Sequence, residues 1–105
     1  MIKIDYTITF PDATGLASIT PLPAEIAEVF LACRNEATNR NCIFFGETNN
    51  EGNQRVGSFI WENQTVLDDY NQWAETTHQY SVVYQQYVSL IELNGGTLVR
   101  TTEEF

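Results

Sequence analysis

Residues 2–10 alternate between apolar and polar side chains, and no other feature constrains the fold of this chain as strongly. The apolar residues of this alternation are Ile2, Ile4, Tyr6, Ile8 and Phe10. The polar residues between them are Lys3, Asp5, Thr7 and Thr9. Successive side chains of a strand point to opposite faces, so a period of two predicts a β-strand with one buried face. Pro11 and the residues after it end this strand.

A three- and four-residue periodicity predicts a helix after a loop over residues 11–20. The segment Thr20-Pro21-Leu22-Pro23 opens this helix, because proline is tolerated in a first helical turn. The helix is expected to end near Thr38-Asn39. Its apolar stripe comprises Leu22, Ile26, Val29, Phe30, Cys33 and Ala37.

A second helical region is expected to consist of a short helix at about 66–75 and a longer helix at about 77–93. Thr65 and Thr76 each begin a match to a helix-capping pattern, in which a Ser or Thr side chain caps the first turn. Asn94-Gly95-Gly96 provides a strong stop signal. The apolar stripe of the longer helix comprises Tyr80, Val83, Tyr84, Tyr87, Leu90 and Ile91.

Three further strands complete the set of predicted elements. Residues 41–48 and 55–62 are strand-like, and the polar loop 49–54 between them contains a glycine, which predicts an antiparallel hairpin. Residues 97–104 form the last strand. It is more polar than the others, which is typical of an edge strand.

The order β-α-β-β-α-β predicts one α+β domain of the ferredoxin-like kind over residues 1–105. Right-handed crossovers in its two halves give a four-stranded antiparallel sheet with the helices on one face and the first and third strands in the centre. The opposite face is left bare. Phe44 and Phe45 point to opposite faces, as do Ile60 and Trp61, so some apolar side chains lie on the bare face. Such patches indicate an interface, and packing two sheets face to face would bury them.

At the level of pattern, the chain resembles the dimeric α+β barrel proteins, whose members include the antibiotic-biosynthesis-monooxygenase-like domains. The resemblance lies in the length, the order of elements, and the aromatic strand end Phe59-Ile60-Trp61-Glu62 that leads into a split helix. It implies a homodimer whose two sheets form a barrel. It also implies a cleft for a small organic molecule between sheet and helices, and cofactor-free oxygenation of an electron-rich substrate.

Charge and composition exclude several classes of partner. The net charge is −9, and the five basic residues are scattered singly along the chain: Lys3, Arg34, Arg40, Arg55 and Arg100. Binding to nucleic acid requires clustered basic residues, so neither nucleic acid nor an anionic membrane is expected as a partner. The N-terminus lacks the apolar region of a signal peptide, and no apolar run approaches a membrane span, so a cytoplasmic protein is expected. Cys33 and Cys42 lack the spacing of a redox or zinc site and are expected to be reduced.

Two sets of residues are candidates for function. His78 is the only histidine, and as a general base it would need an orienting partner such as Glu75. Asp68-Asp69 is better explained as favourable charge in a first helical turn. No sequence motif for a metal or a cofactor occurs, and neither is expected. A set of aromatic residues would meet around one sheet face and line a pocket for a flat organic ligand, and they are Tyr6, Trp61, Tyr70, Trp73, Tyr80, Tyr84 and Tyr87.

Three hypotheses of function therefore remain open. The first is a small homodimeric domain that binds a small organic molecule between sheet and helices. The second is a cofactor-independent monooxygenase-like enzyme that uses His78 or a tyrosine for proton transfer. The third is a structural or regulatory dimer without a ligand.

Overall fold

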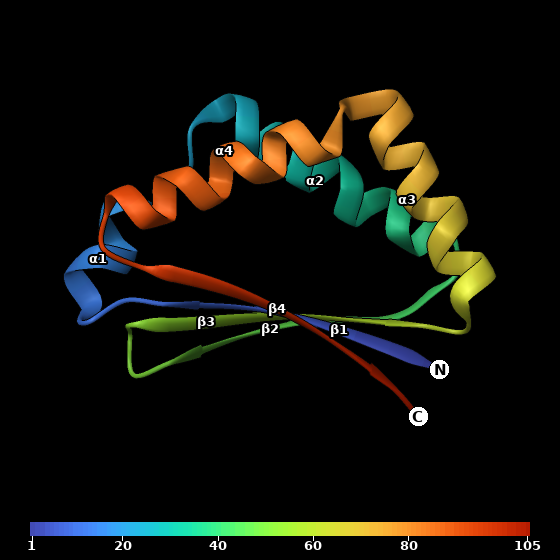
Figure 1. Cartoon of the computed structure of the whole chain (residues 1–105), viewed down its shortest axis with the longest axis horizontal. Helices are drawn as coiled ribbons and strands as arrows, with labels where there is room; N and C mark the ends of the chain where they lie inside the picture. Colours follow the sequence, from blue (N-terminus) through green and yellow to red (C-terminus); the bar gives the residue numbers. More distant parts are fainter.

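In the computed structural model, which describes residues 1–105, all the helices lie on one face of a four-stranded antiparallel sheet (Figure 1). The strand order is β2-β3-β1-β4, so β1 and β3 are central and the polar β4 is an edge strand, as predicted. The strands are β1 (Ile2–Thr9), β2 (Cys42–Asn50), β3 (Gln54–Trp61) and β4 (Thr97–Glu104). The helices are α1 (Ala13–Ser18), α2 (Ala24–Asn39), α3 (Gln64–His78) and α4 (Tyr80–Leu93). The predicted ferredoxin-like α+β fold is confirmed.

The strand register confirms which side chains share a face of the sheet. Ile2 of β1 lies opposite Trp61 of β3, and Tyr6 lies opposite Gly57, all on the helix-covered face. Phe45 lies opposite Phe59, whereas Phe44 lies opposite Ile60, so the two phenylalanines point to opposite faces. A β-bulge between Cys42 and Phe44 inserts one residue into β2, and this insertion decides which face of the sheet each later side chain of the strand points to.

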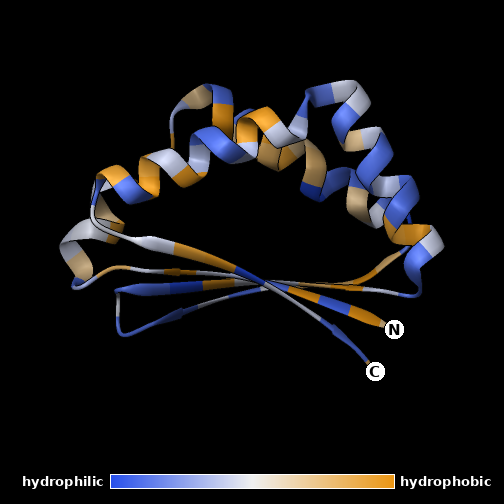
Figure 2. Cartoon of the chain, in the orientation of Figure 1, coloured by the Kyte–Doolittle hydropathy of each residue, from blue (hydrophilic) through white to orange (hydrophobic).

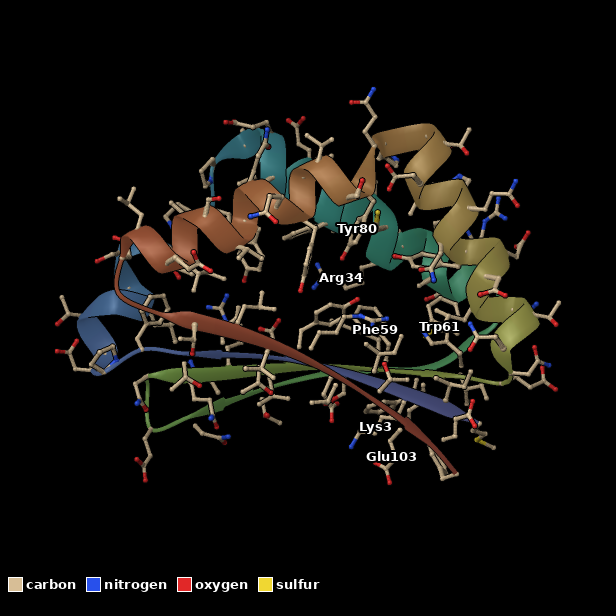
Figure 3. The ribbon with its side chains drawn as sticks, viewed as in Figure 1. Lys3, Arg34, Phe59, Trp61, Tyr80 and Glu103 are labelled. Carbon is tan, nitrogen blue, oxygen red and sulfur yellow. The ribbon has the colours of Figure 1, made fainter.

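The bare face of the sheet is mostly polar. Lys3 lies opposite Glu103 in the register, and both point away from the helices in Figure 3. Asp5 accepts a hydrogen bond of 2.5 Å from the Ser58 hydroxyl and lies 3.6 Å from the Lys3 ammonium group. The helix-covered face therefore holds the apolar core.

The helix starts differ from the predicted ones. Asn63, not Thr65, caps α3, because its side chain accepts a hydrogen bond of 3.0 Å from the Val66 amide. The capping pattern at Thr76 is also wrong as a helix start, since α3 continues to His78. The break falls at Gln79, whose φ of 50° is left-handed. The polar composition of α3 and the more hydrophobic α4 are visible in Figure 2.

The segment predicted as a loop over residues 11–20 contains the short helix α1. Asp12 caps it by accepting a hydrogen bond of 2.9 Å from the Thr14 amide. The helix buries Leu16 against the sheet end and packs around Phe10, which is 1 % exposed. A local cap and a single apolar anchor suffice here because tertiary packing stabilises the turn of helix.

The core consists of two separate clusters on the helix-covered face. The α1-end core is formed by Ile8, Phe10, Leu16, Ile19, Ile26, Tyr87 and Ile91. The α3-end core is formed by Ile2, Ile4, Ala37, Trp61 and Leu67. Cys33 and Cys42 are free thiols. No helix combines the length and the apolar character needed to cross a membrane.

Candidate functional site

A cavity of about 310 Å³ lies between the sheet and the helices, in the stretch that separates the two cores. Strands β1, β2 and β3 form its floor, and α2, α3 and α4 form its roof. Hydrophobic residues make up 13 of the 17 that line it. This size and lining fall in the range of cavities that bind small molecules in proteins.

The floor of the cavity is shaped by a glycine in a central strand. Gly57 of β3 faces the helices, opposite Tyr6, and a Cβ atom added to it would meet no atom within 4 Å. Phe59, the next residue on that face, packs edge-on against Tyr6 at 6.1 Å between ring centroids. A larger residue at position 57 would therefore occupy the space above the strand.

Five of the seven aromatic residues predicted for a pocket line this cavity. They are Tyr6, Tyr70, Tyr80, Tyr84 and Tyr87. Tyr6 lies at the centre, with its ring 6.0 Å from that of Tyr84, which in turn stacks with Tyr80 at 6.0 Å. The helical spacing of Tyr80, Tyr84 and Tyr87 places all three on the face of α4 that meets the cavity.

The buried tyrosines are neutral hydrogen-bonding groups at neutral pH. Burial raises the pKa of Tyr70 and of Tyr80 well above the ordinary range, and nearby phenol and thiol groups raise both further. Burial also raises the pKa of Tyr87, although Arg55 beside it opposes the shift. Cys33 lies against Tyr70, and burial raises the pKa of its thiol. None of these groups is a ready base at neutral pH.

The two tryptophans of the predicted set lie outside the cavity lining. Trp61 is 1 % exposed in the α3-end core, where it packs against Tyr70 at 4.7 Å between centroids. Trp73 also packs against Tyr70, at 6.0 Å between centroids, and lies under the guanidinium of Arg40 at 5.5 Å. Both tryptophans therefore support the wall that Tyr70 presents to the cavity.

His78 lies at the end of α3, edge-on to Trp73 at 5.2 Å, and does not line the cavity. Its suggested partner Glu75 is engaged elsewhere, because it accepts hydrogen bonds from the amide and hydroxyl of Ser81, at 2.9 and 2.7 Å. These bonds lower the pKa of Glu75 and cap the first turn of α4. The catalytic role of His78 stays a prediction.

The acidic pair Asp68-Asp69 lies in the second turn of α3 and not, as was predicted, in the first turn, because the helix already begins at Gln64. Both carboxylates have structural partners. Asp69 accepts a hydrogen bond of 2.8 Å from Arg40, and Asp68 accepts one of 2.7 Å from Gln64. No group of three or more His, Cys, Asp or Glu side chains is arranged to hold a metal ion.

Three charged residues that sequence reasoning did not place in the site line the cavity: Arg34, Glu47 and Arg55. Arg55 lies two residues before Gly57, and Glu47 two residues after Phe45, so the period-two pattern of each strand could have placed both on the helix-covered face. Arg34 follows Phe30 by four residues, which puts both on one side of α2. They were not predicted there because charged side chains are normally exposed on the protein surface.

The mouth of the cavity lies between α2 and the edge strand β2. Its exposed lining residues are Leu31, Arg34, Phe45 and Glu47. The guanidinium of Arg34 lies over the ring of Phe45 at 5.3 Å, and Figure 3 shows Arg34 projecting from α2 toward Phe59 between the two layers. A molecule entering here would pass an arginine before it reached the tyrosines.

Comparison with known proteins establishes the fold and not a family. No family model matches the sequence, and no curated protein matches it. A dimeric ferredoxin-like protein from an uncultured marine organism superposes with a TM-score of 0.59 and 13 % identity, over 97 % of this chain and 92 % of that one.

Two further solved structures share the fold. A conserved protein of unknown function from Bacteroides thetaiotaomicron, described as a possible oxidoreductase, has a TM-score of 0.55 and 17 % identity, over 99 % of this chain and 96 % of that one. An antibiotic biosynthesis monooxygenase has a TM-score of 0.50 and 14 % identity, over 100 % of this chain and 99 % of that one. The resemblance predicted from the sequence is confirmed at the level of the fold.

Proposed function

We propose that this chain is a small homodimeric domain that binds a small organic molecule in the cavity between sheet and helices. The observation that carries the proposal is the open space above Gly57, enclosed by tyrosines and bordered by a filled core at each end. A glycine inside a strand weakens it and often marks close approach of a ligand.

The lining matches a flat organic molecule with polar substituents. The rings of Tyr6, Phe59 and Phe45 form a continuous aromatic wall, with 4.8 Å between the centroids of Phe45 and Phe59. Aromatic walls favour planar ligands through stacked and edge-on contacts. The neutral tyrosine hydroxyls supply donors and acceptors for oxygen or nitrogen atoms on such a ligand.

Filling the cavity tests the proposal directly. Gly57→Leu places a side chain in the open space, and we expect it to abolish binding of 2-naphthol measured by isothermal titration calorimetry. Gly57→Ala is the matched control, because one methyl group leaves most of the cavity free. Circular dichroism checks that both variants fold. Equal binding of 2-naphthol by the native chain and the leucine variant would contradict the proposal.

Two observations support the proposed homodimer: the bare face of the sheet carries exposed apolar side chains, and a solved structure with the same fold is a dimeric ferredoxin-like protein. Phe44 and Val99 lie on that face with 50 % and 54 % of their surface exposed. We expect Phe44→Glu to shift the chain from dimer to monomer in sedimentation equilibrium. Leu93→Glu, at the end of α4 and away from the sheet, is the control and should leave the dimer intact. A monomeric native chain would remove the support for this assembly.

The second candidate function is cofactor-independent oxygenation, which the fold shared with a monooxygenase favours. Its test uses 1-naphthol and dioxygen, which can balance as 1,4-naphthoquinone and water. Oxygen uptake by the native chain that is lost in Gly57→Leu would support an enzyme, and His78→Ala or Tyr80→Phe would then identify the proton-transfer group. Binding without oxygen uptake supports a binding protein instead. A chain that binds nothing would favour the third hypothesis, a structural dimer.

A further inference from the structure

We infer that the cavity selects a planar aromatic molecule carrying one carboxylate, with Arg34 at the mouth binding the carboxylate and the tyrosines contacting the ring. This inference rests on the proposed function, because it specifies the ligand class of the same cavity. It comes from the distribution of charge and not from any neighbour.

Basic residues outnumber acidic residues in the cavity lining, which is the reverse of their proportion in the whole chain. The chain has 14 acidic and 5 basic side chains, yet two of the five basic residues and only one acidic residue line the cavity. The other three basic residues are not among those that line it. Arg100 of β4 lies over the ring of Tyr6 at 5.9 Å and donates a hydrogen bond of 3.3 Å to the Thr102 hydroxyl. Arg40 is paired with Glu36 and Asp69, and Lys3 lies on the bare face beside Asp5.

The single acidic residue offsets only one of the two arginines. Glu47 lies 3.8 Å from the Nε atom of Arg55, whereas Arg34 has no carboxylate within 4.0 Å. The two arginines and one glutamate leave one net positive charge in the lining of a chain whose net charge is −9. A ligand with a single negative charge would complete the site.

The geometry around Arg34 favours a carboxylate attached to a ring. Its guanidinium lies over the Phe45 ring at 5.3 Å, which orients the guanidinium plane at the entrance. The N–H groups at the edge of that plane are then available to donate hydrogen bonds to a ligand. A guanidinium fork binds a carboxylate through two parallel hydrogen bonds. The aromatic wall continues inward from Phe45 to Phe59 and Tyr6, so an attached ring would extend along it.

The test compares two probes of the same shape, 2-naphthoate and its neutral isostere 2-naphthamide, by isothermal titration calorimetry at constant ionic strength. We expect the native chain to bind naphthoate about tenfold more tightly than naphthamide or better, the ratio typical of a charge-assisted hydrogen bond. Arg34→Gln should remove this preference by weakening naphthoate while leaving the amide unchanged.

Lys3→Gln is the matched control, because both substitutions remove one positive charge from the chain but Lys3 lies on the opposite face of the sheet. A preference that survives in Lys3→Gln and is lost in Arg34→Gln supports the inference. Equal binding of both probes by the native chain, with both lost in Gly57→Leu, would overturn the inference and leave the proposed function standing. Binding of neither probe would count against both.

Discussion

The two ends of the space between sheet and helices are filled, whereas its middle is open, although one strand runs through all three parts. Along β1, Ile2 and Ile4 belong to the α3-end core and Tyr6 lines the cavity. Ile8 belongs to the α1-end core and borders the cavity from that side. On β1 itself, therefore, isoleucines face the two filled ends, and a side chain with a polar tip faces the open middle.

The difference follows from what each kind of side chain requires when it is buried. Aliphatic groups are stabilised by close packing alone. The end cores accordingly group side chains of the sheet and of the helices, such as Ile8 with Ile91 and Ile4 with Leu67. A tyrosine hydroxyl needs a partner when it is removed from water. Around Gly57 the tyrosines find polar partners in one another, in Cys33 and in Arg55. Together they line the space above the glycine and leave it open.

The strongest test of this comparison is truncation at a filled end. Phe10→Ala should lower the free energy of unfolding by about 3–5 kcal/mol, because the ring is 1 % exposed and its loss leaves a cavity. Phe45→Ala at the mouth should cost less, since Phe45 is 36 % exposed. Urea unfolding followed by circular dichroism measures both changes. Equal losses would show that the end and the middle are packed alike.

A milder test adds one methyl group at the same end. A Cβ atom on Gly96 would approach Cε1 of Phe10 to 2.5 Å, so Gly96→Ala must displace the ring. We expect a loss of about 1–3 kcal/mol, as for other overpacked cores, in the same urea experiment. An unchanged midpoint of urea unfolding would mean that the residues around the Phe10 ring leave it room to move.

Alkaline pH probes the tyrosines of the middle. Burial raises the pKa values of Tyr70 and Tyr80 in the folded chain, so the unfolded chain loses protons first as the pH rises above about 10. Their contribution to stability is complete below that pH and declines above it. We expect unfolding free energies to fall above pH about 10, and to fall less steeply in Tyr80→Phe. Identical slopes would show that Tyr80 ionises freely in the folded chain.

The smallest expected effect has the opposite sign. Gly57→Ala should raise the free energy of unfolding by about 0.5–1 kcal/mol, because alanine restricts the unfolded chain and its methyl group meets no atom within 4 Å. Thermal unfolding of this variant beside Gly96→Ala gives the comparison in one experiment. Destabilisation by Gly57→Ala would mean that the middle is filled.

The fold was predictable because its signals are local and repeat over whole elements. The alternation in residues 2–10 and the helical stripe ending at Asn94-Gly95-Gly96 predicted the strand, the helix and the order of elements. Helix starts were less predictable, because Asn63 and Thr65 both suit a cap and only the path of the chain selects Asn63. The short helix α1 depends on Phe10 and Leu16 meeting the core, which no local pattern shows.

The candidate site was predictable only in part, for the same reason. Tyr80, Tyr84 and Tyr87 share a helix face by spacing alone, so their common direction followed from the sequence. Trp61 has the same aromatic character, but its place at the end of β3 puts it in a filled core. The four-residue spacing of Arg34 from Phe30 puts both on one side of α2, but only the docking of that helix over the sheet places Arg34 at the mouth of the cavity.

The sequence by itself determined the elements, their order and the face that each strand buries, because those properties depend on the nature and spacing of neighbouring residues. Only the tertiary structure decided where the space between the layers is filled and where it stays open. That depends on which side chains from distant segments face one another, such as Gly57 beneath the tyrosines and Phe10 beside Gly96. Packing is a property of such pairs, and no single stretch of sequence contains both members.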